Sequence, residues 1–575
     1  MRGLWLAPFL SVLAATRVTL GATWYVAPTG NDGAAGTEAA PLASLAAAQA
    51  KAKAGDTVLL RGGTYAFAKG TAACSSGTAT ISGVVLDKDG SPGSPINYFA
   101  YPGEVPVLDF DGIRDSCRIK GILLSADYVH LRGLELRGVR QNNDLNHESW
   151  GVWIQGSHNV LEALDVHHIM GAGVFIQRGS DNLVLNCDSH HNLDEHTSNG
   201  AGESADGFGC HVSAGETGNV FRGCRAWWNA DDGYDFINAD AACTVEQSWA
   251  WYNGYKPDTM DGIGNGNGFK AGGYGTDPAQ FPASPAVHVV RSCLAFMNKA
   301  AGFYANHHPV SSLFYNNTSY ANHPDFNMLG MNDAGQATTV GVYRNNVALG
   351  GTLFSNRNDA DDANNAWSIA GISVADADFL SVSAMGMDGP RHPDGSLPEL
   401  TNFRLAQASD LIDRGVDVKL PFAGSAPDLG AFEVGLEAPG AVAGAGGSGG
   451  GGNAAGSVAV AGTGSDDAGG GVPAAGAGPG SGGAAGTALG GFETGGVTPL
   501  GGADAASAGA SVNGSKSLAV DDVGCACALG RSHSPPLTLA ALAFLLGARP
   551  RHRARKRRRS RRDRYKEIPL RLWLF

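Results

Sequence analysis

Four aspartates and one lysine occupy matching positions in three short stretches of this 575-residue sequence. The stretches run from Ala205 to Gly209, from Asn229 to Asp235 and from Gly266 to Lys270. Each contains a polar residue, then a glycine, an aromatic residue and one residue more. When the stretches are aligned on this glycine, the residues before it are Asp206, Asp232 and Asn267. The residues two positions after it are Gly209, Asp235 and Lys270.

This alignment has chemical meaning if the stretches are successive turns of a coil, because equivalent residues would then lie side by side. The carboxylates that would meet are those of Asp206, Asp231, Asp232 and Asp235. Such a group favours a divalent cation with oxygen ligands, and Ca²⁺ is the usual occupant. A lysine beside that cation loses its proton more easily, so Lys270 is predicted to act as a base. One Asp-Gly pair alone would be interpreted as a turn, so the prediction depends on the alignment.

Internal repeats decide the fold class. The segment that begins at Asn159 recurs at Asn182, an offset of 23 residues, and further copies follow. The copies share an asparagine at one position: Asn192, Asn229, Asn253, Asn298 and Asn322. Five residues before it stands Cys187, Cys224, Ser248, Cys293 or Asn317. The basic turn therefore has about 23–24 residues, and two of the turns carry long insertions.

Each repeat alternates apolar and polar residues in short β-rich runs with glycine at the bends. An all-β parallel β-helix explains this pattern, since stacked turns gather equivalent side chains into columns about 4.8 Å apart. The asparagines are then expected to form a hydrogen-bonded ladder, and the cysteines to face the interior. A leucine-rich solenoid would need a Leu-x-x-Leu-x-Leu pattern, and a β-propeller would have a longer period.

The composition divides the chain into four segments. Residues 1–22 are predicted to be a signal peptide, because a basic residue precedes an apolar run too short to span a bilayer. Residues 23–435 form the β-helix domain, with a strand–helix–strand cap at its start and a capping segment, 397–435, that packs on the coil. Residues 436–517 are rich in Gly, Ala and Ser and are predicted to be a disordered linker. Residues 518–575 contain a cysteine motif, a short apolar run and an Arg-rich tail.

Charge and cysteine content narrow the classes of function. Residues 549–567 contain 12 Lys or Arg and 2 Asp or Glu, which gives this segment a net charge of +10. The whole chain has a net charge of −13, so the rest of the chain has a net charge of −23. An acidic body is a poor binder of nucleic acid, so no nucleic-acid partner is expected, whereas an acidic polymer can bind through a bridging metal. Export favours disulfides. Of the nine cysteines, Cys74 and Cys117 lie outside the repeats and are a candidate pair, although sequence cannot settle connectivity.

The three aligned stretches resemble the signature of polysaccharide lyase family 9, which contains secreted pectate lyases with a right-handed parallel β-helix. The stretches Trp24 to Gly30, Gly55 to Tyr65 and Pro427 to Glu433 fit the same family. The resemblance spans about residues 23–435. It implies that Asp206, Asp231, Asp232 and Asp235 bind Ca²⁺ and that Lys270 is the catalytic base. Residues 518–575 resemble the myxobacterial C-terminal sorting tag, which implies processing and attachment to the membrane or cell surface.

The resemblance implies β-elimination on pectate or a related uronate polymer, in which Lys270 removes the proton on C5 of the sugar and the oxygen on C4 leaves. We therefore expect a secreted, extracellular monomer that acts on an acidic polysaccharide. One alternative is a glycoside hydrolase that uses two carboxyl groups, which would leave Lys270 without a role. Another is a non-catalytic carbohydrate-binding surface β-helix. Aromatic residues near the site are interpreted as core packing rather than as sugar-stacking faces: Trp227, Trp228, Tyr234, Trp249, Trp251 and Tyr252.

Overall fold

The computed structural model describes residues 21–75, 79–142, 148–197, 200–275, 277–332, 335–339, 341–351, 353 and 361–436. These residues belong to one unit of the chain, which runs from Met1 to Gly446. Nearly all of the predicted signal peptide lies outside the described residues, as do the predicted linker and the C-terminal segment. None of the helices in the described ranges is long and apolar enough to cross a membrane.

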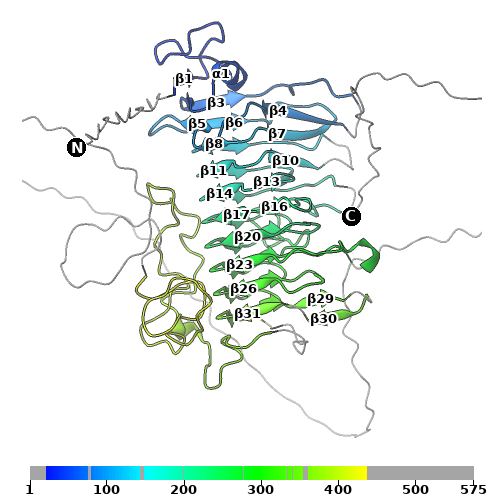
Figure 1. Ribbon diagram of the computed structural model, residues 1–575, viewed down its shortest axis with the longest axis vertical. Helices are drawn as coiled ribbons and strands as arrows, with labels where there is room; N and C mark the ends of the chain where they lie inside the picture. Colours follow the sequence, from blue (N-terminus) through cyan, green and yellow to red (C-terminus); the bar gives the residue numbers. More distant parts are fainter. Residues whose placement is uncertain are drawn as a thin grey trace, which may run out of the picture. The chain divides into compact units, whose positions relative to one another are not determined.

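The described part of the chain is a parallel β-helix with three parallel sheets, which run along the stack of turns in Figure 1. The first sheet has 11 strands: β1 (Thr23–Val26), β2 (Thr57–Leu60), β5 (Ile96–Ala100), β8 (Val129–Arg132), β11 (Val160–Glu162), β14 (Leu183–Leu185), β17 (Asn219–Arg222), β20 (Cys243–Glu246), β23 (Val289–Arg291), β26 (Leu313–Tyr315) and β31 (Val342–Arg344).

The second sheet has nine strands: β4 (Thr80–Leu86), β7 (Arg118–Leu124), β10 (Ser149–Ile154), β13 (Gly171–Ile176), β16 (Phe208–Cys210), β19 (Tyr234–Asp235), β22 (Phe269–Lys270), β25 (Phe303–Tyr304) and β28 (Phe326–Asn327). The third has ten: β3 (Gly63–Ala66), β6 (Pro106–Asp109), β9 (Glu135–Arg137), β12 (Asp165–His167), β15 (Asp188–His190), β18 (Arg225–Trp227), β21 (Trp249–Trp251), β24 (Leu294–Phe296), β27 (Thr318–Tyr320) and β32 (Val347–Leu349). A separate antiparallel pair joins β29 (Leu329–Met331) to β30 (Ala337–Thr339). The described helices are α1 (Leu45–Lys51) and the short 3₁₀ helices η1 (Pro278–Gln280) and η2 (Asp376–Asp378).

Columns of equivalent residues fill the interior of the coil. One column lies along the second sheet and stacks its rings with centroids 4.7–5.0 Å apart: Phe208, Tyr234, Phe269, Phe303 and Phe326. All five side chains are buried. The column that contains Cys187, Cys224 and Cys293 is also buried, and these cysteines are free. This agrees with the prediction that the cysteines face inward as compact apolar filling.

The predicted asparagine ladder is present. The side-chain amide of each member donates to the side-chain oxygen of the next at 2.8–2.9 Å: Asn192, Asn229, Asn253, Asn298 and Asn322. All of them are buried. A buried amide must be hydrogen-bonded to avoid a large desolvation cost, so the ladder fixes the bend between the third sheet and the second at these five turns.

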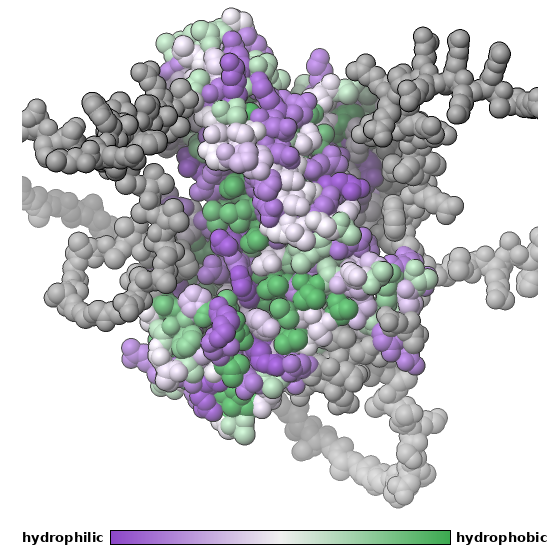
Figure 2. Space-filling model, in the orientation of Figure 1, coloured by the Kyte–Doolittle hydropathy of each residue, from purple (hydrophilic) through white to green (hydrophobic). Residues whose placement is uncertain are grey.

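The two ends of the domain are covered. Helix α1 begins after Ser44, whose hydroxyl accepts from the backbone N–H of Ala47, and it packs on β1 and β4. The segment 361–436, yellow-green to yellow in Figure 1, packs on the coil, whereas the capping segment had been predicted only from residue 397. Its side chains cover aromatic residues of the third sheet, with Phe379, Met387 and Phe403 in the same buried cluster as Trp249 and Trp251. On the face in Figure 2, hydrophilic residues dominate over the first turns and hydrophobic patches lie over later ones.

Two disulfides link neighbouring turns. The predicted pair, Cys74 and Cys117, is bonded. A second bond joins Cys210 of β16 to Cys243 of β20 and was not predicted. It closes a loop of 33 residues that contains β19 and most of the predicted site. Sequence alone cannot identify such a pair, because connectivity depends on which turns lie side by side.

Candidate active site

The five predicted residues lie on three successive turns, at the second sheet. Gly209 pairs with Asp235, and Asp235 pairs with Lys270, so the alignment of the three stretches is the register of the structure. The backbone N–H of Gly207 donates to Asp232, and that of Gly233 donates to Asn267. These bonds place Asp206, Asp232 and Asn267 in the neighbouring column, as the sequence predicted.

The glycine shared by the three stretches allows the turns to approach closely. A Cβ atom at Gly207, Gly233 or Gly268 would lie 2.6–2.8 Å from the backbone oxygen of the next turn. It would also lie about 3 Å from a side-chain amide of the asparagine ladder. Any side chain would therefore push the turns apart, and the carboxylates that flank the glycine would separate.

Three of the four predicted ligands form a compact group. Asp206, Asp232 and Asp235 each offer a carboxylate oxygen, and these oxygens all lie within 4.8 Å of one another. The three side chains are buried. Backbone amides hold them in place: the N–H of Asp232 donates to Asp206 Oδ1 at 3.1 Å, and that of Ile237 donates to Asp235 Oδ1 at 2.7 Å.

Asp231 lies beside this group but is not one of its three members. Its Oδ1 accepts from the backbone N–H of Asn265 at 2.8 Å, so it fixes the long insertion before β22 to the site. Asn267 was placed in the aspartate column by the alignment but was given no role. Its amide donates to Asp232 Oδ1 at 2.8 Å, and its own oxygen accepts from the N–H of Ala301. Asn267 therefore orients Asp232.

Lys270 is the counter-ion of the carboxylates. Its Nζ lies 3.1 Å from Asp232 Oδ2 and 3.1 Å from Asp235 Oδ2, and only 9% of the residue is exposed. Burial alone would lower the pKa of Lys270, but the charges of the four aspartates raise it well above its usual range. In the absence of a cation Lys270 is therefore protonated, not neutral.

The pKa values of three of the aspartates are also raised, which for a carboxyl group disfavours the charged form. Burial, followed by repulsion from Asp231, Asp235 and Asp232, raises the pKa of Asp206 well above its usual value. Burial and the charge of Asp232 do the same for Asp231. Burial also raises the pKa of Asp232, although Lys270 opposes it. Four buried carboxylates with a single lysine have an excess of negative charge, and a divalent cation would remove it. The donor set, oxygen only and compact, fits calcium.

The aromatic residues near the site are mostly core. Tyr234 is fully buried between Phe208 and Phe269. Trp227, Trp249 and Trp251 are buried in the cluster that the C-terminal segment covers. Trp228 and Tyr252 stack on each other and are partly buried against the same cluster. The preference for core packing is thus confirmed.

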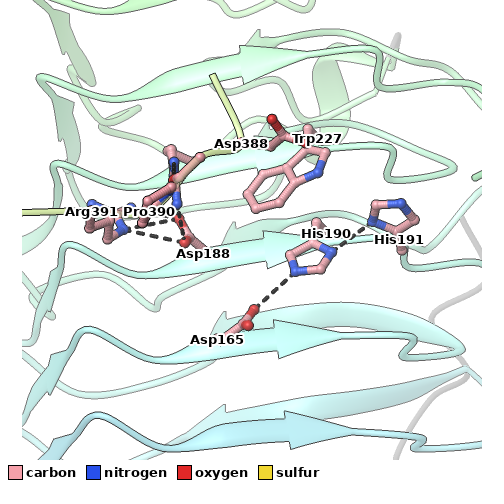
Figure 3. Close-up of a pocket in the computed structure, with 10 residues that line it drawn as sticks. Asp165, Asp188, His190, His191, Trp227, Asp388, Pro390 and Arg391 are labelled. Atoms are coloured by element: carbon pink, nitrogen blue, oxygen red, sulfur yellow. Dashed lines mark hydrogen bonds and ion pairs between the residues drawn. The ribbon is translucent and has the colours of Figure 1, made fainter. Parts of the chain in front are cut away.

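A separate hollow of about 490 Å³ lies beside the C-terminal segment and includes none of the five site residues. Figure 3 shows Asp188 held by Arg391 on one side of it, and His190 between Asp165 and His191 on the other. The stacked rings of His190 and Trp227 form one wall, with centroids 4.1 Å apart. Since Asp188 also pairs with Arg225, the charged groups here fasten the C-terminal segment to the coil.

Known proteins share both the fold and most of the length of this chain. Residues 24–346 match the family described as the Pel9A-like, right handed beta helix region. Pectate lyase L of Dickeya chrysanthemi is 34% identical over 419 residues, which cover 71% of this chain and 90% of that protein. Pectate lyase PEL9 of Emericella nidulans is 32% identical over 424 residues, covering 69% and 95%.

Two solved structures have the same architecture. The crystal structure of pectate lyase Pel9A is 32% identical, with a TM-score of 0.60, and the match covers 72% of this chain and 97% of that one. A rhamnogalacturonan lyase is 32% identical, with a TM-score of 0.63, and covers 67% and 97%. With a family match over more than half of its length, this chain belongs to the Pel9A-like right-handed β-helix family, polysaccharide lyase family 9, and is a polysaccharide lyase of the pectate lyase type.

Proposed function

We propose that this protein is a calcium-dependent lyase that cleaves pectate, or a closely related uronate polymer, by β-elimination with Lys270 as the base. One observation carries the proposal: Lys270 Nζ lies 3.1 Å from two members of a buried carboxylate group that fits calcium. Relatives named pectate lyase support pectate as the substrate. A similar structure named rhamnogalacturonan lyase makes that polymer the second one to test.

Asp206, Asp232 and Asp235 would hold the cation, with Asp231 beside them. Calcium, when bound, supplies the positive charge that withdraws electrons from a sugar carboxylate, acidifies the proton on C5 and offsets the charge of the aspartates. Asn267 and the backbone amides hold the carboxylate oxygens in place before substrate arrives, and such preorganisation lowers the cost of reaching the transition state.

Lys270 accepts the proton from C5. Its amine is positioned by Asp232 and Asp235, and its burial excludes water from the transfer. The unbalanced charges of the aspartates keep it protonated, so it becomes a base only as those charges are neutralised. The electron pair of the C5–H bond then forms the C4–C5 double bond, and the glycosidic oxygen leaves C4 with its own electron pair.

The test uses purified protein on polygalacturonate, with and without a calcium chelator, followed by the ultraviolet absorbance of unsaturated uronate products. Rhamnogalacturonan is tested in parallel. We expect absorbance to rise only with calcium present. Cleavage without unsaturated product would indicate a glycoside hydrolase, and binding without cleavage a non-catalytic surface protein, and either result would overturn the proposal.

We also infer that the protein is secreted and is held at the cell surface through residues 518–575. The apolar N-terminal run and the Arg-rich tail support this. The two disulfides add support, because such bonds persist in oxidising compartments. Cell fractionation, with mass spectrometry of the mature N-terminus, tests it. Intact residues 1–22 on a cytoplasmic protein would contradict it.

A further inference from the structure

Four histidines lie in two rows on the outer face of the third sheet, on successive turns of the coil. His167 ends β12 and His190 ends β15, and these two residues pair in the register of the sheet. His168 and His191 follow them directly. The rings of His167 and His190 stack with centroids 5.0 Å apart, and those of His168 and His191 stack with centroids 5.6 Å apart.

Within each row the two Nδ1 atoms face each other. They are 2.6 Å apart in the row of His167 and His168, and 2.7 Å apart in the row of His190 and His191. The planes of the two rings in a row are inclined by 80° and 84° respectively, so the contact is between nitrogen atoms and not between ring faces. Figure 3 shows the second row, where the ring of His190 lies between Asp165 and His191.

Carboxylates fix the tautomers of the second row. His190 Nε2 lies 2.9 Å from Asp165 Oδ1, and His191 Nε2 lies 3.1 Å from Asp258 Oδ1. An ionised carboxylate only accepts hydrogen bonds, so each Nε2 carries the hydrogen and a neutral ring has its lone pair on Nδ1. Two lone pairs 2.7 Å apart repel each other, so a proton or a metal ion must lie between them.

The second row has the geometry of two neighbouring ligands of a transition-metal ion. With a metal–nitrogen distance of about 2.0 Å, cis ligands of a square-planar or octahedral ion lie about 2.8 Å apart. The distance of 2.7 Å between His190 Nδ1 and His191 Nδ1 is close to this value. Imidazoles that bind a metal usually donate their other nitrogen to a carboxylate or a similar acceptor, and both rings of this row do so.

Solvent reaches the second row through the hollow of about 490 Å³ beside the C-terminal segment, which both of its histidines line. The side chains of His190 and His191 are each 16% exposed, and those of Asp165 and Asp258 are 48% and 78% exposed. A hydrated ion can therefore approach the ring edges, and water from the hollow can complete its coordination shell.

The charge around the second row favours a divalent ion over a proton. The lining of the hollow contains three carboxylates and two guanidinium groups: Asp165, Asp188, Asp388, Arg225 and Arg391. Asp258, at the far edge of His191, is a fourth carboxylate. Four carboxylates and two guanidinium groups leave an excess of two negative charges. A shared proton would offset one of these charges, whereas a divalent cation would offset both.

We propose that His190 and His191 bind a divalent transition-metal ion through their Nδ1 atoms, and that Asp165 and Asp258 orient the two rings. Cu²⁺ is favoured, because it binds most tightly of the first-row divalent ions and accepts cis nitrogens in a square plane. Calcium prefers oxygen ligands, so the carboxylate group around Lys270 and this row select different ions. The site is separate from the proposed lyase chemistry, and its test does not depend on catalysis.

The test is calorimetric titration of Cu²⁺, and then of Ni²⁺ and Zn²⁺, into the full chain without a histidine tag. Saturating Ca²⁺ occupies the carboxylate group around Lys270, and accessible thiols are alkylated first, because thiolates also bind these ions. We expect His190→Gln and His191→Gln to remove the tightest Cu²⁺ site. Asp165→Ala and Asp258→Ala are expected to weaken it by about 10–100-fold, the usual effect of losing such a partner.

His130→Gln is the matched control. His130 Nε2 also meets a carboxylate, that of Glu162 at 2.8 Å, but its ring meets Phe99 instead of another histidine. This variant is expected to bind Cu²⁺ as the unaltered protein does. Electron paramagnetic resonance identifies the ligands, with hyperfine structure from two imidazole nitrogens expected in the unaltered protein and lost in His190→Gln.

Thermal unfolding without metal shows whether each variant folds. If a histidine variant does not fold, Asp258→Ala decides the question, because this side chain is 78% exposed and its replacement disturbs little packing. Folded His190→Gln and His191→Gln proteins that bind Cu²⁺ as tightly as the unaltered protein would overturn the proposal. An unaltered protein that binds none of the three ions would also overturn it, and the shared cation would then be a proton.

Discussion

At the scale of single residues, Lys270 has two opposed roles. Its ammonium is the only cation within 4 Å of Asp232 and Asp235 among the described residues. The same residue is the proposed base, which requires a free amine. The two roles are compatible if the charge of the aspartates is taken over by another cation, so that the strong interaction that holds the lysine in place is weakened when the site is loaded.

The first prediction is that Lys270→Ala lowers kcat on polygalacturonate by about 10²–10⁴-fold, the usual contribution of a positioned base. Calcium binding is expected to persist, and to tighten, because a competing positive charge is removed. Product absorbance and calcium calorimetry measure the two effects. Lys256→Ala, an exposed lysine on the nearby insertion, is the control. A Lys270→Ala protein that cuts at the normal rate would refute the role of this residue.

The second prediction concerns calcium and pH. The pKa values of Asp206, Asp231 and Asp232 are raised in the calcium-free protein by burial and by their acidic neighbours. Protons therefore compete with calcium at a higher pH than they would for ordinary aspartates, whose pKa is about 4. Calcium affinity is expected to fall steadily as the pH is lowered from 8 towards 5. Calorimetry at several pH values measures it, and an affinity that stays constant over this range contradicts the prediction.

The alignment of three short stretches predicted which site residues share a column, since a register of stacked turns can be read from a shared glycine. It did not predict the directions of the side chains. Asp231 turns towards the backbone of Asn265 because the long insertion before β22 folds back against it. The side-chain amide of Asn267 donates to Asp232, a hydrogen bond that the alignment did not indicate. Such details depend on the insertions, which follow no repeat.

At the scale of elements, the asparagine ladder sets the spacing of the turns at the bend next to the site. Asn253 accepts from the N–H and the amide of Asn229, and donates to Asn298 and to the backbone oxygen of Ala226. Its amide also lies against the glycine that precedes Tyr234. The carboxylates therefore depend on the ladder for their positions.

The third prediction is that Asn253→Ala lowers the free energy of unfolding by about 1–3 kcal/mol, because buried partners on both neighbouring turns lose a hydrogen bond. Urea unfolding measures the change. Asn31→Ala, at an exposed turn, is expected to have little effect. An equal stability of the two variants would show that the ladder does not bear on folding.

The strands were easier to predict from the sequence than the packing of the C-terminal segment over the third sheet. The predicted strand–helix–strand cap is present as β1, α1 and β2, because short β-rich runs between turn residues are a strong local signal. The helix of this cap begins at Leu45, since Ser44 caps it. The environments of Trp249 and Trp251 could not be read from their strand, because they are buried by the distant residues of the C-terminal segment.

At the scale of the whole domain, the C-terminal segment is fastened to the coil by a buried cluster of charges. Asp188 lies 2.6 Å from Arg225 and 2.6 Å from Arg391. Arg225 also donates to the backbone oxygens of Met387 and Gly389, and Arg391 to those of Gly223 and Gly395. Each arginine thus joins the third sheet to residues of the segment.

The fourth prediction is that Arg391→Ala lowers the free energy of unfolding by about 3–5 kcal/mol, the usual cost of removing one partner from a buried charged group. The rate of cleavage at saturating substrate should change little, because the proposed site lies on the second sheet. Thermal unfolding and product absorbance measure the two effects. Arg178→Ala is the control, since Arg178 is half-exposed and its ion pair with Glu216 is 3.9 Å long.

The pH dependence of the difference in unfolding free energy between Arg391→Ala and the unaltered protein distinguishes loss of the ion pair from loss of packing. Burial by itself would raise the pKa of Asp188, but Arg391 and Arg225 lower it to about 2. Because this folded-state pKa lies below the unfolded value, the interaction stabilises the protein above about pH 4 and is lost as the pH falls towards 2. The difference between Arg391→Ala and the unaltered protein should therefore shrink on acidification from pH 4. A difference that stays constant down to pH 2 would mean that Arg391 acts through packing alone.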